Sequence, residues 1–396
     1  MQSEKSNSSQ ELSGEMKGDH PNKLKSIYEE LSQEASQEKD SADPNKSFLH
    51  GLDPGLFIER EREYKDIEKH WIRTKVWLKV AKDLAQETKR KHNRGIRYFT
   101  LPAYYRLDVS LFLREELLEV IERYSNGNAK KVYVAAFESD PTKYARMVGH
   151  SPEFHLFADT SVEDALTDTN NPYYNQLLPL FPFDIVNLDL TTSLTPKHEG
   201  PYSTTMKAID SVFKRQAEHG SKWALFITFR NMPDDWDEAT LDQLFDNLQS
   251  NVDNYPIVGK TFDERYRETR VRNLYKKDPK QCISQAVAKW LVDRANYYNL
   301  RVESLKCYTY PRQSIGLPPY FIYKQIMIFS KGEVLRGIVP TKGTPAQPWV
   351  VDDLVACIDD HKCVDVEGTI LATLENLPSY EDQLKKDIDD LCKMIG

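Results

Sequence analysis

The sequence predicts an α/β protein built on a doubly wound, mostly parallel sheet that ends in an antiparallel hairpin. Unbroken apolar runs such as Val132–Phe137 and Trp223–Phe229 alternate with amphipathic helical stretches, which is typical of parallel strands covered on both faces. Two later runs, in LRVESLKCYTYPR and PPYFIYKQIMIFSKG, alternate apolar and polar residues. The loop between them is too short for a crossover, so these two strands must pair antiparallel.

The N-terminal part divides into two predicted segments. Residues 1–46 are rich in Ser, Glu, Gln, Asp and Lys and form a predicted disordered tail, because they cannot bury enough apolar area to offset the entropy of ordering. Residues 47–94 form a predicted leading helical segment, in which Trp71, Trp77 and Leu84 recur at helical spacing. The opposite face of this helix is basic, and Gly95 is its expected end.

Residues 95–331 form the predicted sheet domain of seven strands. The expected strands are Ile96–Leu101, Val132–Phe137, a weaker one in EFHLFADTS, Phe183–Leu188, Trp223–Phe229 and the two of the hairpin. The expected helices are DVSLFLREELLEVIERY, PTKYARMVGH, one that Ser203 or Thr204 caps and Gly220 ends, and QCISQAVAKWLVDRANYYN. Residues 332–396 form a C-terminal appendage with short helices.

Composition restricts the class of protein. The net charge of −8 and the pI near 5.7 exclude a wholly basic surface, although local basic patches stay possible. The five cysteines include no CxxC pair, so we expect scattered reduced thiols rather than a disulfide framework or a zinc ribbon. The N-terminus has no apolar signal core, and no apolar run approaches the roughly 20 residues of a membrane span. These features predict a cytoplasmic protein without a membrane segment.

Acidic residues follow several of the predicted strands. Glu138 follows the second, Asp159 the third and Asp189 the fourth, and ligands of doubly wound sheets bind beyond these carboxyl ends. Simpler roles are a solvated strand-end carboxylate for Glu138 and a helix N-cap for Asp159, which Ser161 could equally provide. Asp184 stands at the entry of the fourth strand, at the opposite edge, where we expect a solvated or structural role.

This order of strand–helix units closing in a hairpin, from about Gly95 to Lys331, resembles the class I S-adenosylmethionine-dependent methyltransferase fold, whose seven-stranded sheet has its last strand inserted antiparallel. The resemblance implies that S-adenosylmethionine is the cofactor. It also implies that Glu138 binds the ribose, that Asp159 contacts the adenine amino group, and that Asp189 faces the methyl-transfer site.

The first loop departs from the pattern of this family, in which a glycine-rich turn usually follows the first strand and lets the backbone approach the ligand. This chain has YFTLPAYYRLDVSLF there, without a glycine between Gly95 and Gly127. Two interpretations stay open. Either the loop follows another path and Asp108 supplies a carboxylate for the amino group of the cofactor, or cofactor binding is lost.

A second candidate site is the basic stretch TFDERYRETRVRNLYKK. Tyr266 and Tyr275 interleave there with basic residues, a pattern that suits phosphate contacts and base stacking. The candidate nucleic-acid-binding residues are Arg265, Arg267, Arg270, Arg272 and Lys276. A solvated helix face with internal ion pairs is the simpler interpretation. The dispersed histidines His150, His155, His198 and His219 give no metal-binding spacing.

Two functions therefore remain. The first is methyl transfer from S-adenosylmethionine to a nucleic acid or a protein. The second is a methyltransferase fold that has lost its cofactor and serves as a nucleic-acid-binding or protein-binding subunit. The strand-end acids favour the first function, whereas the glycine-free loop and the Arg/Tyr stretch favour the second.

Overall fold

The computed structural model describes residues 66–102, 106–148, 152–190, 192–197, 203–312, 320–331, 348–359, 363–377 and 379–392. The predicted tail of residues 1–46 and the start of the predicted leading segment lie outside them. Internal contacts divide the chain into two units. The larger unit extends from Glu68 to Ile370, whereas Leu371–Asp389, which includes most of the last helix, belongs to the second unit.

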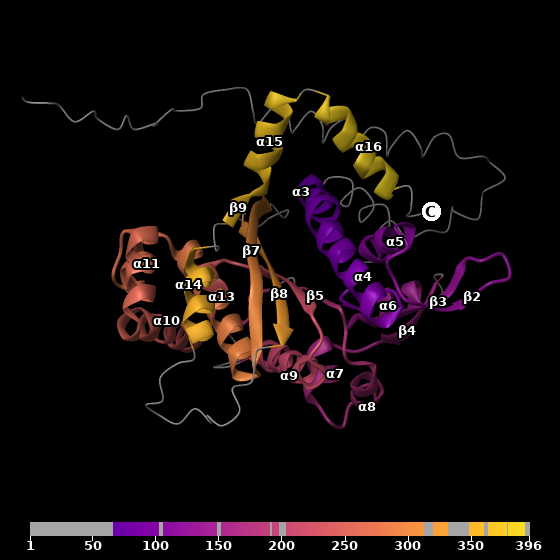
Figure 1. Cartoon of the computed structure of the whole chain (residues 1–396), viewed down its shortest axis with the longest axis horizontal. Coiled ribbons are helices and arrows are strands. Elements are labelled where there is room, and N and C mark those ends of the chain that lie inside the picture. Colours follow the sequence, from indigo (N-terminus) through magenta and orange to yellow (C-terminus); the bar gives the residue numbers. More distant parts are fainter. Residues whose placement is uncertain are drawn as a thin grey trace, which may run out of the picture. The chain divides into compact units, whose positions relative to one another are not determined.

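Among the described residues, a mixed sheet of nine strands forms the centre of the larger unit and confirms the predicted α/β class (Figure 1). The strand order is β2-β3-β1-β5-β6-β8-β7-β9, and β4 pairs with β3. The bounds are β1 (Tyr98–Thr100), β2 (Val120–Arg123), β3 (Ala129–Phe137), β4 (Glu153–Ala158), β5 (Ile185–Asp189), β6 (Trp223–Arg230), β7 (Leu300–Arg312), β8 (Tyr320–Lys331) and β9 (Cys363–Asp365).

The pairing directions follow the predicted division between crossovers and hairpin. Strands β4, β3, β1, β5 and β6 pair parallel in this order. Strand β8 pairs antiparallel with both β6 and β7, as predicted from the short connection. Two short strands that the sequence did not predict extend the sheet, because β2 pairs antiparallel with β3 and β9 pairs parallel with β7.

Helices connect most of the strands. They are α3 (Ile67–Trp71), the π-helix η2 (Ile72–Trp77), α4 (Leu78–His92), α5 (Leu107–Arg114), α6 (Pro141–Met147), α7 (Val162–Thr167), α8 (Tyr174–Leu177), α9 (Thr204–His219), α10 (Glu238–Asn254), α11 (Pro256–Tyr266), α12 (Val271–Lys277), α13 (Pro279–Tyr297), α14 (Pro348–Asp359), α15 (Val366–Asn376) and α16 (Tyr380–Cys392). Within the described residues, no helix has the length and apolarity that crossing a membrane requires.

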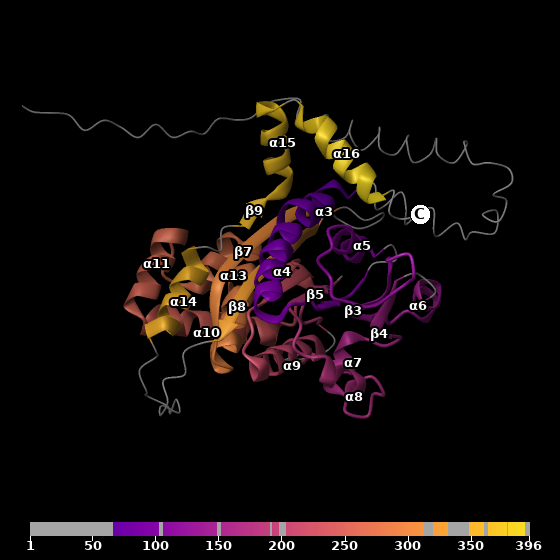
Figure 2. The same ribbon diagram turned by 45° about the vertical axis from the view of Figure 1, so that its right-hand side comes forward.

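Helices cover both faces of the sheet (Figures 1 and 2). On one face, alternate strand residues such as Phe99 and Leu225 join a large buried cluster with α7, α9, α10 and α13. On the other face, Trp77 of η2 stacks on Phe226 of β6, with ring centroids 5.3 Å apart. The unbroken apolar strands of the sequence thus have the two-sided burial that their pattern predicted.

The prediction of a continuous helix over DVSLFLREELLEVIERY is wrong in its second half. Helix α5 ends in a Schellman-type cap, in which Glu116 adopts φ 55° and the Leu117 amide donates to the Phe112 carbonyl. Glycine usually occupies such a left-handed position. Because Glu116 occupies it here, the sequence contained no glycine to mark the end of the helix. The following Val120–Arg123 then pair with β3 as β2.

Two further predictions about helix ends are resolved. Helix α4 ends at His92, with Asn93 in the left-handed region at φ 52°, rather than at Gly95. Helix α9 has Ser203 as its N-cap, which accepts a hydrogen bond from the Met206 amide, and Gly220 as its left-handed C-cap, as predicted.

The prediction that all the cysteines are scattered thiols is wrong for one pair. Cys307 of β7 and Cys363 of β9 are register partners in adjacent strands and form a disulfide. The sequence separation of 56 residues concealed this pairing. Cys282 and Cys357 are free and buried.

Candidate functional site at the carboxyl edge of the sheet

Glu138 and Asp159 lie side by side at the carboxyl edge of the sheet. They directly follow Phe137 and Ala158, which are register partners in the parallel strands β3 and β4. The Glu138 amide also donates to the Ala158 carbonyl at 3.1 Å. Glu138 is half-buried and Asp159 is exposed. The fold thus brings together two of the acids that the sequence singled out.

Glu138 has a local partner. Its Oε1 accepts a hydrogen bond from the Asp140 amide at 2.8 Å. Asp140 in turn caps α6 by accepting from the Thr142 and Lys143 amides. This turn fixes the direction of the Glu138 carboxylate, because one of its oxygens is anchored to the backbone and the other is not used in that bond.

Asp159 is paired with Tyr173, which follows α7 in the chain. The Tyr173 hydroxyl donates to Asp159 Oδ1, and this bond, with partial burial, raises the pKa of Tyr173 to about 12. Ser161, not Asp159, is the N-cap of α7, since it accepts from the Asp164 amide. The Asp159 carboxylate therefore does not cap α7.

Asp189, the predicted catalytic residue, ends β5 between two lysines. Its carboxylate lies 3.1 Å from Lys69 Nζ of α3 and 3.5 Å from Lys324 Nζ of β8. The Lys324 side chain is only 1% exposed, and its Nζ lies 4.6 Å from the centroid of the Trp77 ring. Burial alone would raise the pKa of Asp189, but the charges of Lys324 and Lys69 outweigh it and hold the pKa far below its usual range. Asp189 thus stays ionised and is a poor proton acceptor.

Asp108 belongs to a separate buried polar cluster. Its Oδ2 accepts hydrogen bonds from the Tyr98 hydroxyl at 2.5 Å, the Thr100 hydroxyl at 2.9 Å and the Asn187 amide at 3.4 Å. These bonds fasten the first turn of α5 to β1 and β5. Burial, followed by the charge of Asp108, raises the pKa of Tyr98 well above its ordinary value. The hypothesis that Asp108 binds a cofactor amino group stays a prediction, and its carboxylate already has three protein donors.

Arg106 replaces the missing glycine of the first loop in one respect. It precedes α5 with φ 50°, a left-handed conformation that glycine usually supplies. Its guanidinium donates to the Met147 and Pro152 carbonyls and lies 4.1 Å from the Phe154 ring centroid. Burial lowers the pKa of Arg106 to about 10. Side-chain contacts thus stabilise the turn; residues 103–105 lie outside the described part.

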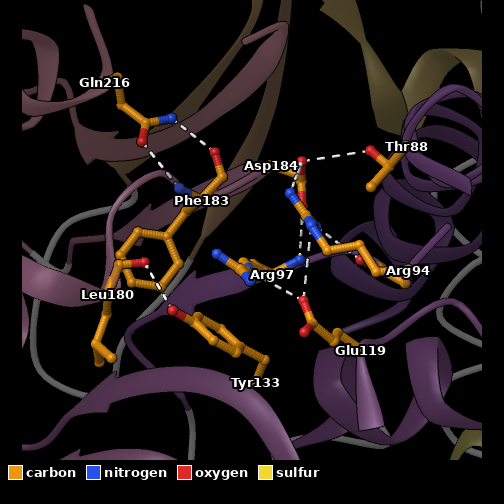
Figure 3. A network of polar contacts seen from close by, with 10 residues as sticks. Thr88, Arg94, Arg97, Glu119, Tyr133, Leu180, Phe183, Asp184 and Gln216 are labelled. Atoms are coloured by element: carbon orange, nitrogen blue, oxygen red, sulfur yellow. Dashed lines mark hydrogen bonds and ion pairs between the residues drawn. The ribbon is translucent and has the colours of Figure 1, made fainter. Parts of the chain in front are cut away.

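Asp184 has a structural role, which is one of the two roles that the sequence predicted. The other predicted role, a solvated carboxylate, is wrong. Asp184 is 3% exposed, and it accepts hydrogen bonds from the Arg94 guanidinium at 2.6 Å, the Arg97 amide at 2.7 Å and the Thr88 hydroxyl at 3.3 Å (Figure 3). The network joins α4 to the entry edge of β1 and β5. Asp184 and His219 also line a pocket of 210 Å³ at this opposite edge.

The predicted nucleic-acid-binding residues lie on helices α11 and α12 and on the short turn between them, in the segment that connects β6 to α13. All five are exposed, but Arg270 pairs with Asp253 at 3.3 Å and Arg272 with Asp242 at 2.5 Å. The interleaved tyrosines point inward, because the Tyr266 hydroxyl donates to Gln285 and the Tyr275 ring packs on Phe245. Nucleic-acid binding stays a prediction.

Within the described residues, no group of three His, Cys, Asp or Glu could hold a metal ion; His150 and His198 lie outside them.

A family model described as PP_RS20740-like matches residues 148–317, which is less than half of the chain and runs from the start of β4 to the end of β7. Among curated proteins, no match was found.

Proposed function

We propose that this chain is an S-adenosylmethionine-dependent methyltransferase-like protein, and that its cofactor binds at the carboxyl edge of β3 and β4. The adjacency of Glu138 and Asp159 at this edge carries the proposal. Support comes from the strand order, because β4-β3-β1-β5-β6 follows the 3-2-1-4-5 order of doubly wound nucleotide-binding folds. The antiparallel β8 between β6 and β7 corresponds to the inserted strand of the methyltransferase family.

The proposed roles follow from the partners of each acid. Glu138 accepts hydrogen bonds from the ribose hydroxyls, since the turn at Asp140 fixes its carboxylate. Asp159 accepts a hydrogen bond from the adenine amino group. Asp189 acts as a fixed charge that positions Lys69 and Lys324 near the methyl acceptor. Transfer then depends on holding the acceptor in line with the sulfonium methyl group, which suits catalysis by positioning.

A second candidate function is that of a catalytically inactive subunit with the same fold, which binds a nucleic acid or a protein. The observation that favours it is the pairing of Asp189 with two lysines, which makes this carboxylate a poor proton acceptor. The exposed Arg265 and Arg267, which have no ion pair among the described residues, are then the first candidates for phosphate contacts.

Calorimetry with S-adenosylhomocysteine, the stable demethylated product, tests the proposed function. We expect saturable binding to the wild-type protein and at least about tenfold weaker binding to Glu138→Gln, because a hydrogen bond to a charged acceptor is lost. The matched control is Glu122→Gln, an exposed glutamate of β2, which should bind as the wild type does. Absence of heat and of any thermal shift at millimolar ligand would contradict the proposal.

The same protein preparation separates the second candidate. An inactive nucleic-acid-binding subunit should give no calorimetric signal with the nucleoside ligand but should retain RNA or DNA on a filter, with an affinity that falls steeply as salt rises. The double variant Arg265→Glu/Arg267→Glu should then lose that retention. Unchanged retention of nucleic acid by this variant would show that Arg265 and Arg267 do not bind it.

A further inference from the structure

The segment after α7 folds back over the end of β4. Asn171 Nδ2 donates to the Thr160 hydroxyl at 2.9 Å, and Asn171 Oδ1 accepts from the Tyr173 amide at 2.9 Å. The Tyr173 ring is half-buried against the core cluster. Asn171 thus ties the Tyr173 backbone to Thr160 at the end of β4, and the Tyr173 hydroxyl donates to Asp159 Oδ1.

We propose that Tyr173 competes with the ligand for Asp159 and thereby lowers the affinity of the nucleoside site. This inference rests on the proposed function. The Tyr173 hydroxyl occupies Asp159 Oδ1, so an adenine amino group meets a carboxylate that already accepts one hydrogen bond. A ligand must displace this bond or share the carboxylate with it.

The energetics of this exchange depend on the donor that the ligand brings. A hydrogen bond to an ionised carboxylate is stronger than one between neutral groups. The exocyclic amino group of an adenosyl ligand replaces the Tyr173–Asp159 hydrogen bond with another of the same kind. An adenosyl ligand therefore recovers most of the free energy that breaking this bond costs. An inosyl ligand presents a carbonyl oxygen at that position, which cannot donate and would face the negative charge of Asp159. The selectivity for the amino group therefore comes from Asp159, and Tyr173 lowers the affinity of the site for the adenosyl ligand.

The raised pKa of Tyr173 is consistent with this arrangement, because the neutral phenol is the donor in the bond to Asp159. A bound ligand that takes over Asp159 should release the phenol. The pKa of Tyr173 should then fall from about 12 toward its ordinary value near 10. Alkaline ultraviolet titration of wild-type protein minus Tyr173→Phe, with and without ligand, measures this change directly.

Calorimetry of Tyr173→Phe with S-adenosylhomocysteine and with S-inosylhomocysteine tests the competition. The variant keeps the ring and its packing but removes the donor, so adenosyl affinity should rise by about tenfold, the scale of one hydrogen bond to a charged group. Discrimination against the inosyl ligand should persist in the variant, because Asp159 keeps its negative charge. Tyr174→Phe is the matched control, because the neighbouring hydroxyl accepts a hydrogen bond from Arg215 instead, and it should leave both affinities unchanged.

The outcomes separate this inference from the proposed function. If the wild type binds S-adenosylhomocysteine and Tyr173→Phe binds it equally or more weakly, the competition is refuted while the proposed function stands. If neither protein binds the ligand, both are refuted. A gain that persists in Asp159→Asn/Tyr173→Phe relative to Asp159→Asn would also overturn the inference, because the effect would not pass through Asp159.

Discussion

At the scale of single residues, Asp189 and Lys324 show that a charged side chain in a buried strand indicates a partner of opposite charge. Lys324 lies on the same face of β8 as the buried Ile322 and Ile326, and a lysine is almost never fully buried without a partner. The sequence signal for this ion pair was therefore Lys324 itself, a charged residue at an inward position of an alternating strand. Its partner Asp189 is 135 residues away in the chain, and Lys69, the second lysine at Asp189, is 120 residues from that carboxylate. Only the fold identifies these pairs.

The Asp189 ion pairs predict a stability effect. Asp189→Asn should lower the free energy of unfolding at pH 7 by about 3 kcal/mol, because it removes a counter-charge from the buried Lys324. The pKa of Asp189 is lowered in the folded state, so its contribution is present above the unfolded pKa near 4 and is lost as the pH falls further.

Urea unfolding at pH 7 and at pH 3 measures this effect. The difference between Asp189→Asn and the wild type should narrow at the lower pH. The exposed Asp263→Asn provides the control, with a change within about 0.5 kcal/mol. Equal stability of wild type and Asp189→Asn at pH 7 would mean that the ion pairs contribute nothing net.

Asp353 of α14 predicts the opposite pH dependence. Burial raises its pKa to about 6, although the Val302 amide donates to it at 3.2 Å. A raised carboxylate pKa contributes stability below the unfolded pKa, and this stability is lost as the pH rises from about 4 to 6. Asp353→Asn should therefore stabilise the protein at pH 7.5, by about 1 kcal/mol after allowance for solvent screening, and much less at pH 5.

Thermal unfolding at these two pH values tests the Asp353 prediction, with the exposed neighbour Asp352→Asn as the control. A loss of stability at pH 7.5 in Asp353→Asn would show that the charged carboxylate, rather than its neutral form, suits this position.

At the scale of elements, the sequence predicted the long apolar strands, the hairpin and the capped α9, because each has a strong local pattern. It missed β2, since the stop after α5 uses Glu116 rather than glycine. It also missed β9, whose three residues carry too little pattern to distinguish a strand from a loop. The edge position of β9 depends on a contact with β7 that is distant in sequence.

The disulfide predicts a chemical signature for this edge. Under non-reducing conditions, peptide mapping should recover Cys307 and Cys363 linked to each other. Cys282 and Cys357 should resist alkylation until the protein is denatured, because both are buried and burial raises the pKa of each thiol to about 12. Recovery of Cys307 and Cys363 as separately alkylated peptides from native, unreduced protein would contradict the pairing.

At the scale of the whole molecule, the strand order reverses between β1 and β5, where doubly wound sheets place their ligands. The sequence predicted that Glu138 and Asp159 end two successive strands of the chain, because strand-end acids can be read from the order of elements. It could not predict that Tyr173 lies over Asp159 or that Asp108 is tied to Tyr98, because these contacts depend on how loops and helices pack after the sheet has formed.

Hydrogen–deuterium exchange with and without S-adenosylhomocysteine tests the central claim most directly, because it locates the bound ligand without a substitution. The proposed site predicts slower exchange at the end of β3 through Asp140, at the end of β4 through Ser161, and in the segment from Asn171 to Tyr174. Exchange that stays unchanged in these three segments at saturating ligand, or protection confined to the edge formed by β7 and β9, would contradict the claim.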